Sequence, residues 1–346
     1  MIISRTPFRI SFFGGGTDYP VWFREHGGAV LSTTIDKYCW ITCRNLPPFF
    51  DHHYRIIYSQ MEHVKTIDEI KHISVRECLK FMKIKYGVEI HHDGDMPART
   101  GIGSSSSFTV GLLHALHALK GKIVSKADLF QKAIHVEQEL NKENVGSQDQ
   151  AAAAFGGMNR FDFLKTGDIQ NTPITISAEK KQYLQKHFLL YFTGFSRTAS
   201  EIAKHQIENT KNKTRELTEM YGMVESAMKI LNQKGMELTD FGKLLHESWL
   251  LKRELSHKVS TSEIDTLYES AREAGAIGGK LLGAGGGGFI LFFVKPELQD
   301  AFKEKFKNLL HVPFAFESSG SEIVFYKPNE YGDEFYMKHH HHDITQ

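Results

Sequence analysis

Residues Pro97 to Ser107 read Pro-Ala-Arg-Thr-Gly-Ile-Gly-Ser-Ser-Ser-Ser, and they lead directly into the segment Phe108-Thr-Val-Gly-Leu-Leu-His-Ala-Leu-His-Ala-Leu119. Apolar residues recur in the second segment at helical spacing, which predicts a buried helix. A loop of small residues that opens a helix offers unpaired N–H groups and the positive end of the helix dipole to an anion. One serine would be an ordinary N-cap. Four serines behind Gly-x-Gly favour a phosphate-binding loop.

Two commoner phosphate-binding motifs are excluded. A Walker A motif requires Gly-Lys-Ser/Thr, but leucine follows the glycine-rich pair Gly279-Lys280. The segment Gly283-Ala-Gly-Gly-Gly-Gly288 fits the dinucleotide pattern G-x-G-x-x-G. That pattern must follow a strand and open a helix, whereas here it precedes the buried-strand sequence Phe289-Ile-Leu-Phe-Phe-Val294. NAD binding is therefore not expected.

The composition of the 346 residues is that of a soluble globular protein. Lys and Arg (42) nearly balance Asp and Glu (41), so no nucleic-acid or anionic-membrane surface is expected. No apolar run approaches the roughly 20 residues of a membrane helix, and the N-terminus lacks the order of a signal peptide. The chain has 3 cysteines, an odd number, and their spacing is not that of a metal site or of a disulfide framework. This favours buried thiols and a cytoplasmic location. We expect the histidine pairs and the run 339–342 to be solvated surface. Nothing in the sequence predicts an oligomeric state.

Three further segments carry candidate functional residues. A strand over residues 2–13, interrupted at Pro7, ends in Gly14-Gly-Gly-Thr-Asp18. This segment is either a tight turn or a place where a ligand rests against bare backbone. Glu137 lies beside the apolar stripe of a predicted helix that begins at Ser125. Asp149 stands where a small-residue loop becomes an alanine helix, where it could cap the helix or act as a catalytic base.

The polar stretch 165–186 is the best candidate for a domain boundary. Helical patterns cover residues 68–86 before it and approximately 199–211, 214–234, 239–255 and 262–274 after it. Strands are expected at 188–192, 288–294, 312–317 and 322–326, with a helix near 297–309. This split β-α-β-β pattern with extra helices indicates an α+β fold.

With these motifs identified, the chain resembles the GHMP small-molecule kinases. The matching stretches, in the order of the family, are Arg9 to Tyr19, Pro97 to Ser107 and Leu282 to Gly288, and Gly146 to Gln150 resembles the catalytic-aspartate segment of galactokinases. The resemblance implies two α+β domains. Residues 1–178 would form an N-terminal S5-domain-2-like catalytic domain, and residues 179–346 a ferredoxin-like domain with extra helices that completes the cleft.

The resemblance also implies the roles of individual residues. Asp149 would take the proton of the acceptor hydroxyl, and Arg9 would hold that carboxylate and offset charge on the phosphoryl group. Mg²⁺ would be bound by Ser105 and Glu137. ATP would be bound by Pro97, Arg99, Gly101, Ile102, Gly103, Ser104, Ser105, Ser106 and Ser107. The substrate would be contacted by Gly15, Gly16, Thr17 and Asp18, with Gly283, Gly285 and Gly286 closing over the site.

Galactokinases carry Glu and His where this chain has Gly15 and Gly16, which suggests a different sugar. The segments 14–18, 194–200 and 251–256 are similar to those of bacterial kinases that phosphorylate the anomeric hydroxyl of D-glycero-D-manno-heptose 7-phosphate on the route to nucleotide-activated heptose. A phosphorylated sugar requires a second cationic pocket, for which the candidates are Arg197, Lys252 and Arg253. A solvated helix face is an equally good interpretation of Lys252 and Arg253. The alternatives are a fucokinase-like or other anomeric sugar kinase, and a non-catalytic sugar and ATP sensor.

Overall fold

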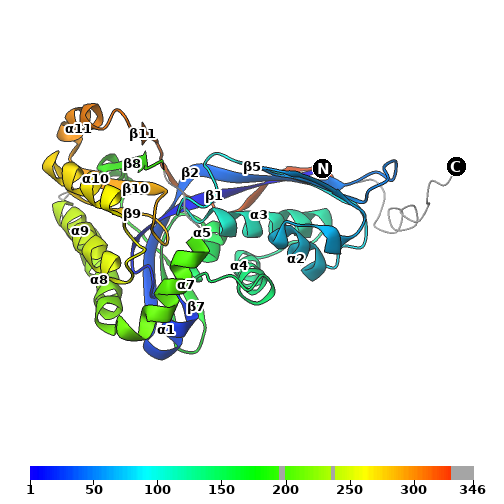
Figure 1. The fold of residues 1–346 in the computed structure, drawn as a ribbon, viewed down its shortest axis with the longest axis horizontal. Helices are drawn as coiled ribbons and strands as arrows, with labels where there is room; N and C mark the ends of the chain where they lie inside the picture. The colour runs from blue at the N-terminus through cyan, green and yellow to red at the C-terminus, as the bar shows by residue number, and fades with distance from the viewer. Residues whose placement is uncertain (195–198, 235–237, 329–346) are drawn as a thin grey trace.

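Two β-sheets form the frame of the computed structural model (Figure 1). The structure describes residues 1–194, 199–234 and 238–328. Within these residues one sheet has nine strands and the other has four. Arg197, one of the residues expected to bind substrate, and the histidine run 339–342 lie outside the described residues.

The first sheet is organised around the long strand β2. Its main path runs in the order β13-β1-β2-β5-β3-β4, while β6 and β12 also pair with β2, and β7 pairs with β6. Residues 28–35 of β2 are buried on both faces, whereas burial alternates toward its C-terminal end, so one face is partly open there. The strands are β1 (Ile2–Phe13), β2 (Gly28–Asn45), β3 (Tyr54–Ile57), β4 (Met61–Val64), β5 (Val88–Gly94), β6 (Met158–Phe163), β7 (Ile169–Pro173), β12 (Phe316–Glu317) and β13 (Glu322–Tyr326).

Helices cover one face of this sheet (Figure 1). The central one is α3, which packs against β1 and β2. Because its sequence combines apolar residues with serine, glycine and alanine, it is buried along most of its length. The elements of this layer are the 3₁₀ turn η1 (Ile67–Glu69), α2 (Ile73–Phe81), α3 (Ser104–Leu119), α4 (Lys126–Ile134), the π-helical segment η2 (His135–Leu140) and α5 (Gln148–Phe155). The short helix α1 (Pro20–His26) lies apart from them, at the bottom of Figure 1.

The second sheet has the strand order β11-β8-β10-β9. In chain order this is 4-1-3-2, the order of the ferredoxin-like β-α-β-β-α-β unit. All six residues of β10 are buried because the strand is central and wholly apolar. The elements are α6 (Ala178–Lys186), β8 (Phe188–Phe192), α7 (Ala199–Asn209), η3 (Thr210–Asn212), α8 (Thr214–Asn232), α9 (Thr239–Glu254), α10 (Ser262–Glu273), β9 (Ala276–Leu281), β10 (Phe289–Val294), η4 (Pro296–Leu298), α11 (Gln299–Lys305) and β11 (Leu310–His311).

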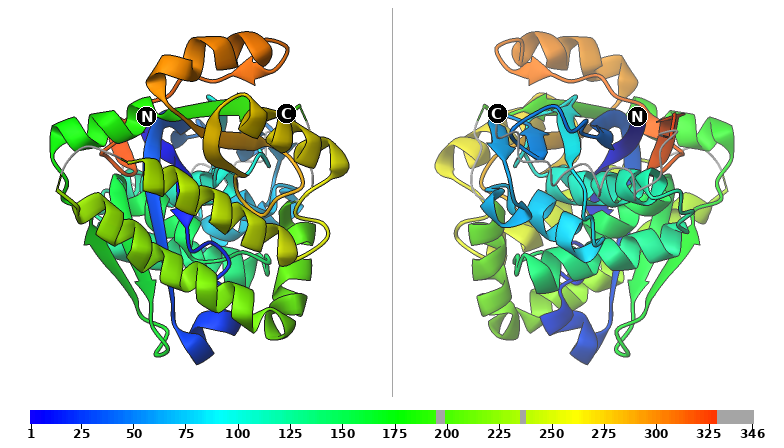
Figure 2. Two further views of the ribbon diagram at one scale, coloured as in Figure 1. Left: turned by 90° about the vertical axis from the view of Figure 1, so that its left-hand side faces the viewer. Right: turned by 90° about the vertical axis from the view of Figure 1, so that its right-hand side faces the viewer.

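The extra helices of this second part join the two sheets. Helices α8 and α9 run side by side (Figure 2, left). Helix α8 contacts both β1 and β2, and α9 contacts β9 of the second sheet. The expected α+β architecture with a ferredoxin-like second sheet is therefore confirmed.

The chain crosses between the sheets more than once. The first crossing is close to the division predicted after residue 178, where α6 leads into β8. The chain later returns, because β12 pairs with β2 and β13 pairs with β1. The predicted division assigns these last two strands to the second part, whereas they belong to the sheet of the first.

Three local expectations need correction. Strand β1 is continuous through Pro7, since β2 pairs with it on both sides of a register shift at that residue. The helix expected over 68–86 is shorter, with η1 before α2 and the helix ending at Phe81. The strand expected over 312–317 is reduced to β12 at residues 316–317, in the first sheet; β11 at residues 310–311 lies before the expected range and belongs to the second sheet.

The three cysteines are buried and unpaired, as expected from their spacing. In the described part of the chain, none of the helices has the length and apolar character needed to span a membrane.

Candidate active site

A bidentate ion pair between Arg9 and Asp149 lies where the first sheet meets its helices. Arg9 is near the end of β1, and Asp149 is in the first turn of α5. Arg9 Nε donates to Asp149 Oδ1 at 2.7 Å, and Arg9 Nη2 donates to Oδ2 at 2.9 Å. The Arg9 side chain is 5% exposed and that of Asp149 is 26% exposed. The planar guanidinium therefore fixes the carboxylate, which remains open to solvent on one side.

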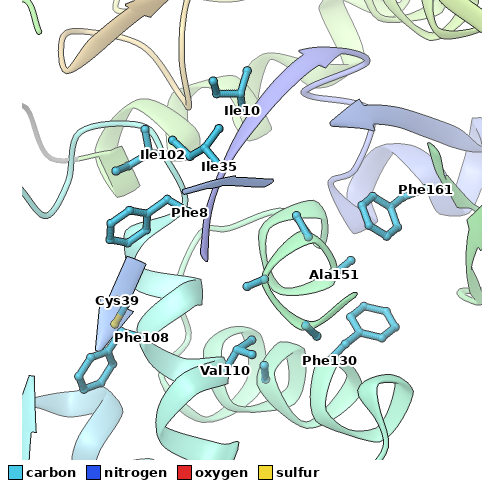
Figure 3. Packing of buried hydrophobic residues seen from close by; sticks show 14 of the residues in the cluster. Phe8, Ile10, Ile35, Cys39, Ile102, Phe108, Val110, Phe130, Ala151 and Phe161 are labelled. Carbon is cyan, nitrogen blue, oxygen red and sulfur yellow. The ribbon is translucent and has the colours of Figure 1, made fainter. Parts of the chain in front are cut away.

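Arg9 also holds the predicted phosphate loop. Its Nη1 donates to the carbonyl of Gly101 at 2.6 Å, and its backbone N–H donates to the carbonyl of Ile102 at 3.1 Å. The side chain of Ile102 is part of the same buried cluster as Phe8 and Ile35 (Figure 3). Ile102 is thus an anchor of the loop in the core, and its side chain is not available to a nucleotide.

Gly103 is the N-cap of α3 and has φ +75°. A β-carbon built there would lie 3.2 Å from Arg9 Cγ and 3.4 Å from Asp149 Cγ. The start of α3, with its free N–H groups, therefore lies directly beside the ion pair. The structure brings the phosphate loop and the predicted base together, as the sequence predicted.

The serines after Gly103 have different surroundings. The hydroxyl of Ser104 accepts from the N–H of Arg99 at 3.2 Å, and that of Ser107 donates to the carbonyl of Pro7 at 3.0 Å. Ser105 is exposed, as are Pro97 and Arg99. Only part of the predicted ATP-binding stretch is therefore free to contact a ligand.

Glu137 is a fully buried carboxylate on η2. Its Oε2 accepts hydrogen bonds from the hydroxyl of Ser106, at 2.8 Å, and from the amide of Gln150. Its Oε1 has no hydrogen-bond partner among the described residues. Burial, and then the nearby Glu143, raise the pKa of Glu137 to about 7. The hydroxyl beside this carboxylate thus belongs to Ser106 and not to Ser105, the serine suggested by the resemblance.

This arrangement fits Mg²⁺. The ion prefers oxygen ligands, and in nucleotide sites it usually takes one or two carboxylates together with phosphate oxygens and waters. A buried carboxylate oxygen without a partner, next to a serine hydroxyl, supplies such ligands. Among the described side chains no group of three or more His, Cys, Asp and Glu could hold a metal by itself, so phosphate oxygens would have to complete the shell.

Asp18 joins the glycine loop after β1 to the start of α5. Its Oδ1 accepts from the N–H of Gly16 at 3.0 Å, and its Oδ2 accepts from the N–H of Gln148 at 3.3 Å. Burial, and then the charge of Asp149, raise the pKa of Asp18. Thr17 is fully buried, and its hydroxyl lies within hydrogen-bond distance of the carbonyls of Gly14 and Ala29. Thr17 therefore shapes this loop and does not reach a ligand.

The glycine-rich loop after β9 packs directly on the phosphate loop. A β-carbon at Gly283 would lie 2.3 Å from Gly101 Cα. The N–H of Phe289 donates to the carbonyl of Thr100 at 3.1 Å, and the N–H of Gly286 donates to the carbonyl of Val259 at 2.8 Å. Segments about 180 residues apart in the sequence therefore form one rim of the site.

Lys252 and Arg253 do not form a solvated helix face. The Lys252 ammonium is buried and donates to the carbonyls of Leu281, at 2.8 Å, and Gly283, at 2.5 Å. Burial, followed by Lys280 and Arg9, lowers its pKa well below the ordinary value. Arg253 donates to Asp265 at 3.0 Å. Both side chains already have partners.

Sequence reasoning missed Gln150 and Lys280 near the ion pair, and it assigned Ser106 to ATP without placing it beside Glu137. Ser106 and Gln150, which hold Glu137, lie inside motifs that were recognised, but a run of four serines does not show which one faces inward. Lys280 is 2% exposed, and its Nζ donates to the carbonyl of Phe12 at 2.9 Å. Lysine is rarely buried, and no sequence signal distinguishes this one.

Comparisons with known proteins define the class. The family model described as "GHMP kinases N terminal domain" matches residues 72–157, and "GHMP kinases C terminal" matches residues 214–311. The chain belongs to the GHMP kinase family and is a kinase.

Several relatives of this chain are sugar or sugar-phosphate kinases. The chain is 30% identical over 307 residues to "D-glycero-alpha-D-manno-heptose 7-phosphate kinase" of Campylobacter jejuni, covering 85% of this chain and 90% of the relative. It is 25% identical to "L-fucokinase/L-fucose-1-P guanylyltransferase" of Bacteroides fragilis, covering 85% of this chain and 35% of that protein. A solved structure of a D-glycero-D-manno-heptose 1-phosphate kinase from "Bacteriodes thetaiotaomicron" shares the fold with a TM-score of 0.78 at 22% identity, covering 94% of this chain and 99% of that one.

Proposed function

We propose that this kinase transfers the γ-phosphoryl group of ATP to the anomeric hydroxyl of D-glycero-D-manno-heptose 7-phosphate, giving the 1,7-bisphosphate. The observation that carries the proposal is the bidentate Arg9–Asp149 pair beside Gly103 at the start of α3. It places a fixed carboxylate next to the N–H groups that would receive the phosphates.

Asp149 is the base in this proposal. One of its oxygens accepts the proton of the sugar hydroxyl as the hydroxyl oxygen bonds to the γ-phosphorus. The bond between that phosphorus and the β,γ-bridging oxygen breaks, and ADP leaves. Since each carboxylate oxygen can accept more than one hydrogen bond, the contacts to Arg9 leave room for the hydroxyl. Most of the rate gain in such a transfer comes from positioning and charge stabilisation.

Glu137 and Ser106 would hold Mg²⁺, which neutralises charge on the nucleotide phosphates when it is bound. Gln150 fixes the orientation of the Glu137 carboxylate through the oxygen that it shares with Ser106. The other oxygen, Oε1, is then the one available to the ion. We therefore assign the metal-binding hydroxyl to Ser106 instead of Ser105.

Buried basic side chains support binding of a polyanion. Arg9, Lys252 and Lys280 are all buried, and Arg9 affects both lysines electrostatically. The carboxylate that Arg9 contacts directly is Asp149. Burial lowers the pKa of both lysines, and the phosphates of ATP would favour the charged form of each.

The choice of a heptose phosphate rests on the similarity to the Campylobacter heptose 7-phosphate kinase and on glycine at positions 15 and 16, where galactokinases carry Glu and His. A fucokinase-like activity is the second candidate, because the fucokinase relative also aligns with 85% of this chain. The two candidates differ in whether the acceptor already carries a phosphate.

The test is an acceptor comparison with Mg²⁺ and ATP, in which ADP release is measured and products are identified by phosphorus NMR. We expect D-glycero-D-manno-heptose 7-phosphate to give one ADP and one new anomeric phosphate per turnover, with little turnover of unphosphorylated heptose, fucose or mannose. Equal turnover of fucose would favour the second candidate. Nucleotide and sugar binding without ADP release from any acceptor would indicate a sensor and contradict the proposal.

A further inference from the structure

Two basic side chains that have no role so far meet at the rim of the site. His205 is on α7, and Lys258 is in the segment after α9. The Lys258 ammonium contacts Nε2 of His205. The other ring nitrogen, Nδ1, lies 3.6 Å from Oε2 of Glu208, and the ring of His257 lies 6.3 Å from that of His205 between centroids. Both His205 and Lys258 are half-buried.

This pair flanks the glycine-rich loop. Gln206, next to His205, donates from Nε2 to the carbonyl of Ala284 at 2.9 Å. Val259, next to Lys258, accepts from the N–H of Gly286 at 2.8 Å. The start of the same loop, at Gly283, packs on Gly101, whose carbonyl is bonded to Arg9. The residues next to this pair and the residues that Arg9 holds therefore contact the same loop, of which residues 283 to 286 span at most roughly 11 Å.

The contact with His205 gives the Lys258 ammonium no counter-charge. A lysine ammonium has only donors, so Nε2 of His205 accepts from it in this contact, while the Glu208 carboxylate lies beside the other ring nitrogen. Among the side chains that the structure describes, no carboxylate lies within ion-pairing distance of the Lys258 ammonium. A phosphate between the two residues would allow both to act as donors, because it offers several strong acceptor oxygens.

The other candidates for a second anion pocket are less suitable. Lys252 is fixed by two backbone carbonyls under the glycine loop, and Arg253 is paired with Asp265. In contrast, Lys258 and His205 are partly open to solvent.

We propose that His205 and Lys258 bind the phosphate that the sugar substrate already carries, distal to the hydroxyl that is phosphorylated. This inference rests on the proposed function, since it requires a phosphorylated sugar as acceptor. It makes the pair the determinant of specificity for sugar phosphates over free sugars.

The test compares Lys258→Gln and His205→Gln with the wild type. Steady-state kinetics are measured with D-glycero-D-manno-heptose 7-phosphate and with unphosphorylated heptose. Lys204→Gln is the matched control, because Lys204 is on the same helix but faces solvent beside Glu208. Thermal melting checks that each variant is folded.

Each variant should raise KM for the phosphorylated heptose about 10-fold to 100-fold, with kcat and the KM for ATP unchanged. That range corresponds to the roughly 1.5–3 kcal/mol of a hydrogen bond to a charged group. Turnover of the unphosphorylated heptose should stay at the wild-type level, and Lys204→Gln should behave as wild type.

Two results would overturn the assignment, and they are distinguishable. If the wild type prefers the phosphorylated sugar and both variants keep that preference, the phosphate is bound elsewhere and only this inference fails. A loss of preference in Arg253→Gln would then identify the alternative. If the wild type itself shows no preference, the proposed function fails as well.

Discussion

Two glycine-rich loops meet at the site, and they use glycine differently. In the loop 101–107, Gly103 caps α3 and leaves the first N–H groups of the helix free beside Asp149. In the loop 283–288, backbone atoms are in contact with other backbone, at Gly101 on one side and Val259 on the other. In the proposed function the first loop receives the nucleotide, whereas the second brings two parts of the chain together.

The difference shows that glycine content alone does not identify a phosphate loop. Both segments contain G-x-G, but they open different elements. The first opens a helix with free N–H groups, whereas the second leads into the central strand β10, whose backbone is paired on both sides. The element after the glycines therefore determines the chemistry.

The largest effect should follow from Gly283→Ala. A β-carbon there would lie 2.3 Å from Gly101 Cα, and the residue has φ +66°. The clash and the strained backbone together should reduce the free energy of unfolding by about 2–5 kcal/mol, measured by denaturant unfolding. The matched control is Gly121→Ala, with φ +63° and no atom within 4 Å of the added carbon. Equal destabilisation of the two variants would show that the loops are not in tight contact.

The next effect concerns Lys280 on β9, the strand that precedes the second loop. Its ammonium donates a hydrogen bond to the carbonyl of Phe12 on β1. Burial, and then Arg9, lower its pKa from 10.5 to about 7. Between these values the unfolded chain binds more protons than the folded one, so this group makes the folded state more stable as pH rises from 7 toward 10.5. The slope should be at most about 1.4 kcal/mol per pH unit, and it should vanish at pH values well below the lowered pKa.

Unfolding of wild type and Lys280→Met at about pH 7.0 and about pH 8.5 measures this slope. The stability of the wild type relative to the variant should increase by up to about 2 kcal/mol between the two pH values. Lys204→Met serves as the control for loss of a lysine at an exposed position. A pH-independent difference for Lys280→Met would show that Lys280 keeps an ordinary pKa in the folded protein.

A smaller effect is expected for Gly103→Ala in the first loop. The added carbon would press on Arg9 Cγ at 3.2 Å and on Asp149 at 3.4 Å. A shift of a few tenths of an ångström in the ion pair should lower kcat about tenfold, since catalysis depends on precise positioning. The control is again Gly121→Ala. An unchanged kcat would show that the geometry of this loop does not affect the rate of phosphoryl transfer.

Much of the fold and part of the site could be predicted from the sequence. The helix after Ser107, the strand after Gly288 and the long C-terminal helices follow from apolar periodicity, which is a local property. The convergence of Arg9, Gly103 and Asp149 was implied by resemblance, because no local rule places residues so distant in sequence together.

The features that the sequence did not predict depend on tertiary packing. The strand β12 has two residues and a weak local signal, and for β13 the sequence predicted a strand but not that it would pair with β1 in the first sheet. Which of the four serines lies beside Glu137 depends on how α3 is oriented about its own axis, and it is Ser106 that faces the carboxylate. The burial of Lys252 and Lys280 contradicts the usual exposure of lysine, and only the three-dimensional structure reveals their carbonyl partners.

The most direct test of the account is the comparison of wild type with Asp149→Asn for both ATP binding and ADP formation with heptose 7-phosphate. The substitution keeps the size of the side chain but removes the base. The account predicts ATP affinity close to that of the wild type and turnover lower by roughly 10²–10⁴-fold. Turnover at the wild-type rate in a folded Asp149→Asn variant would contradict it.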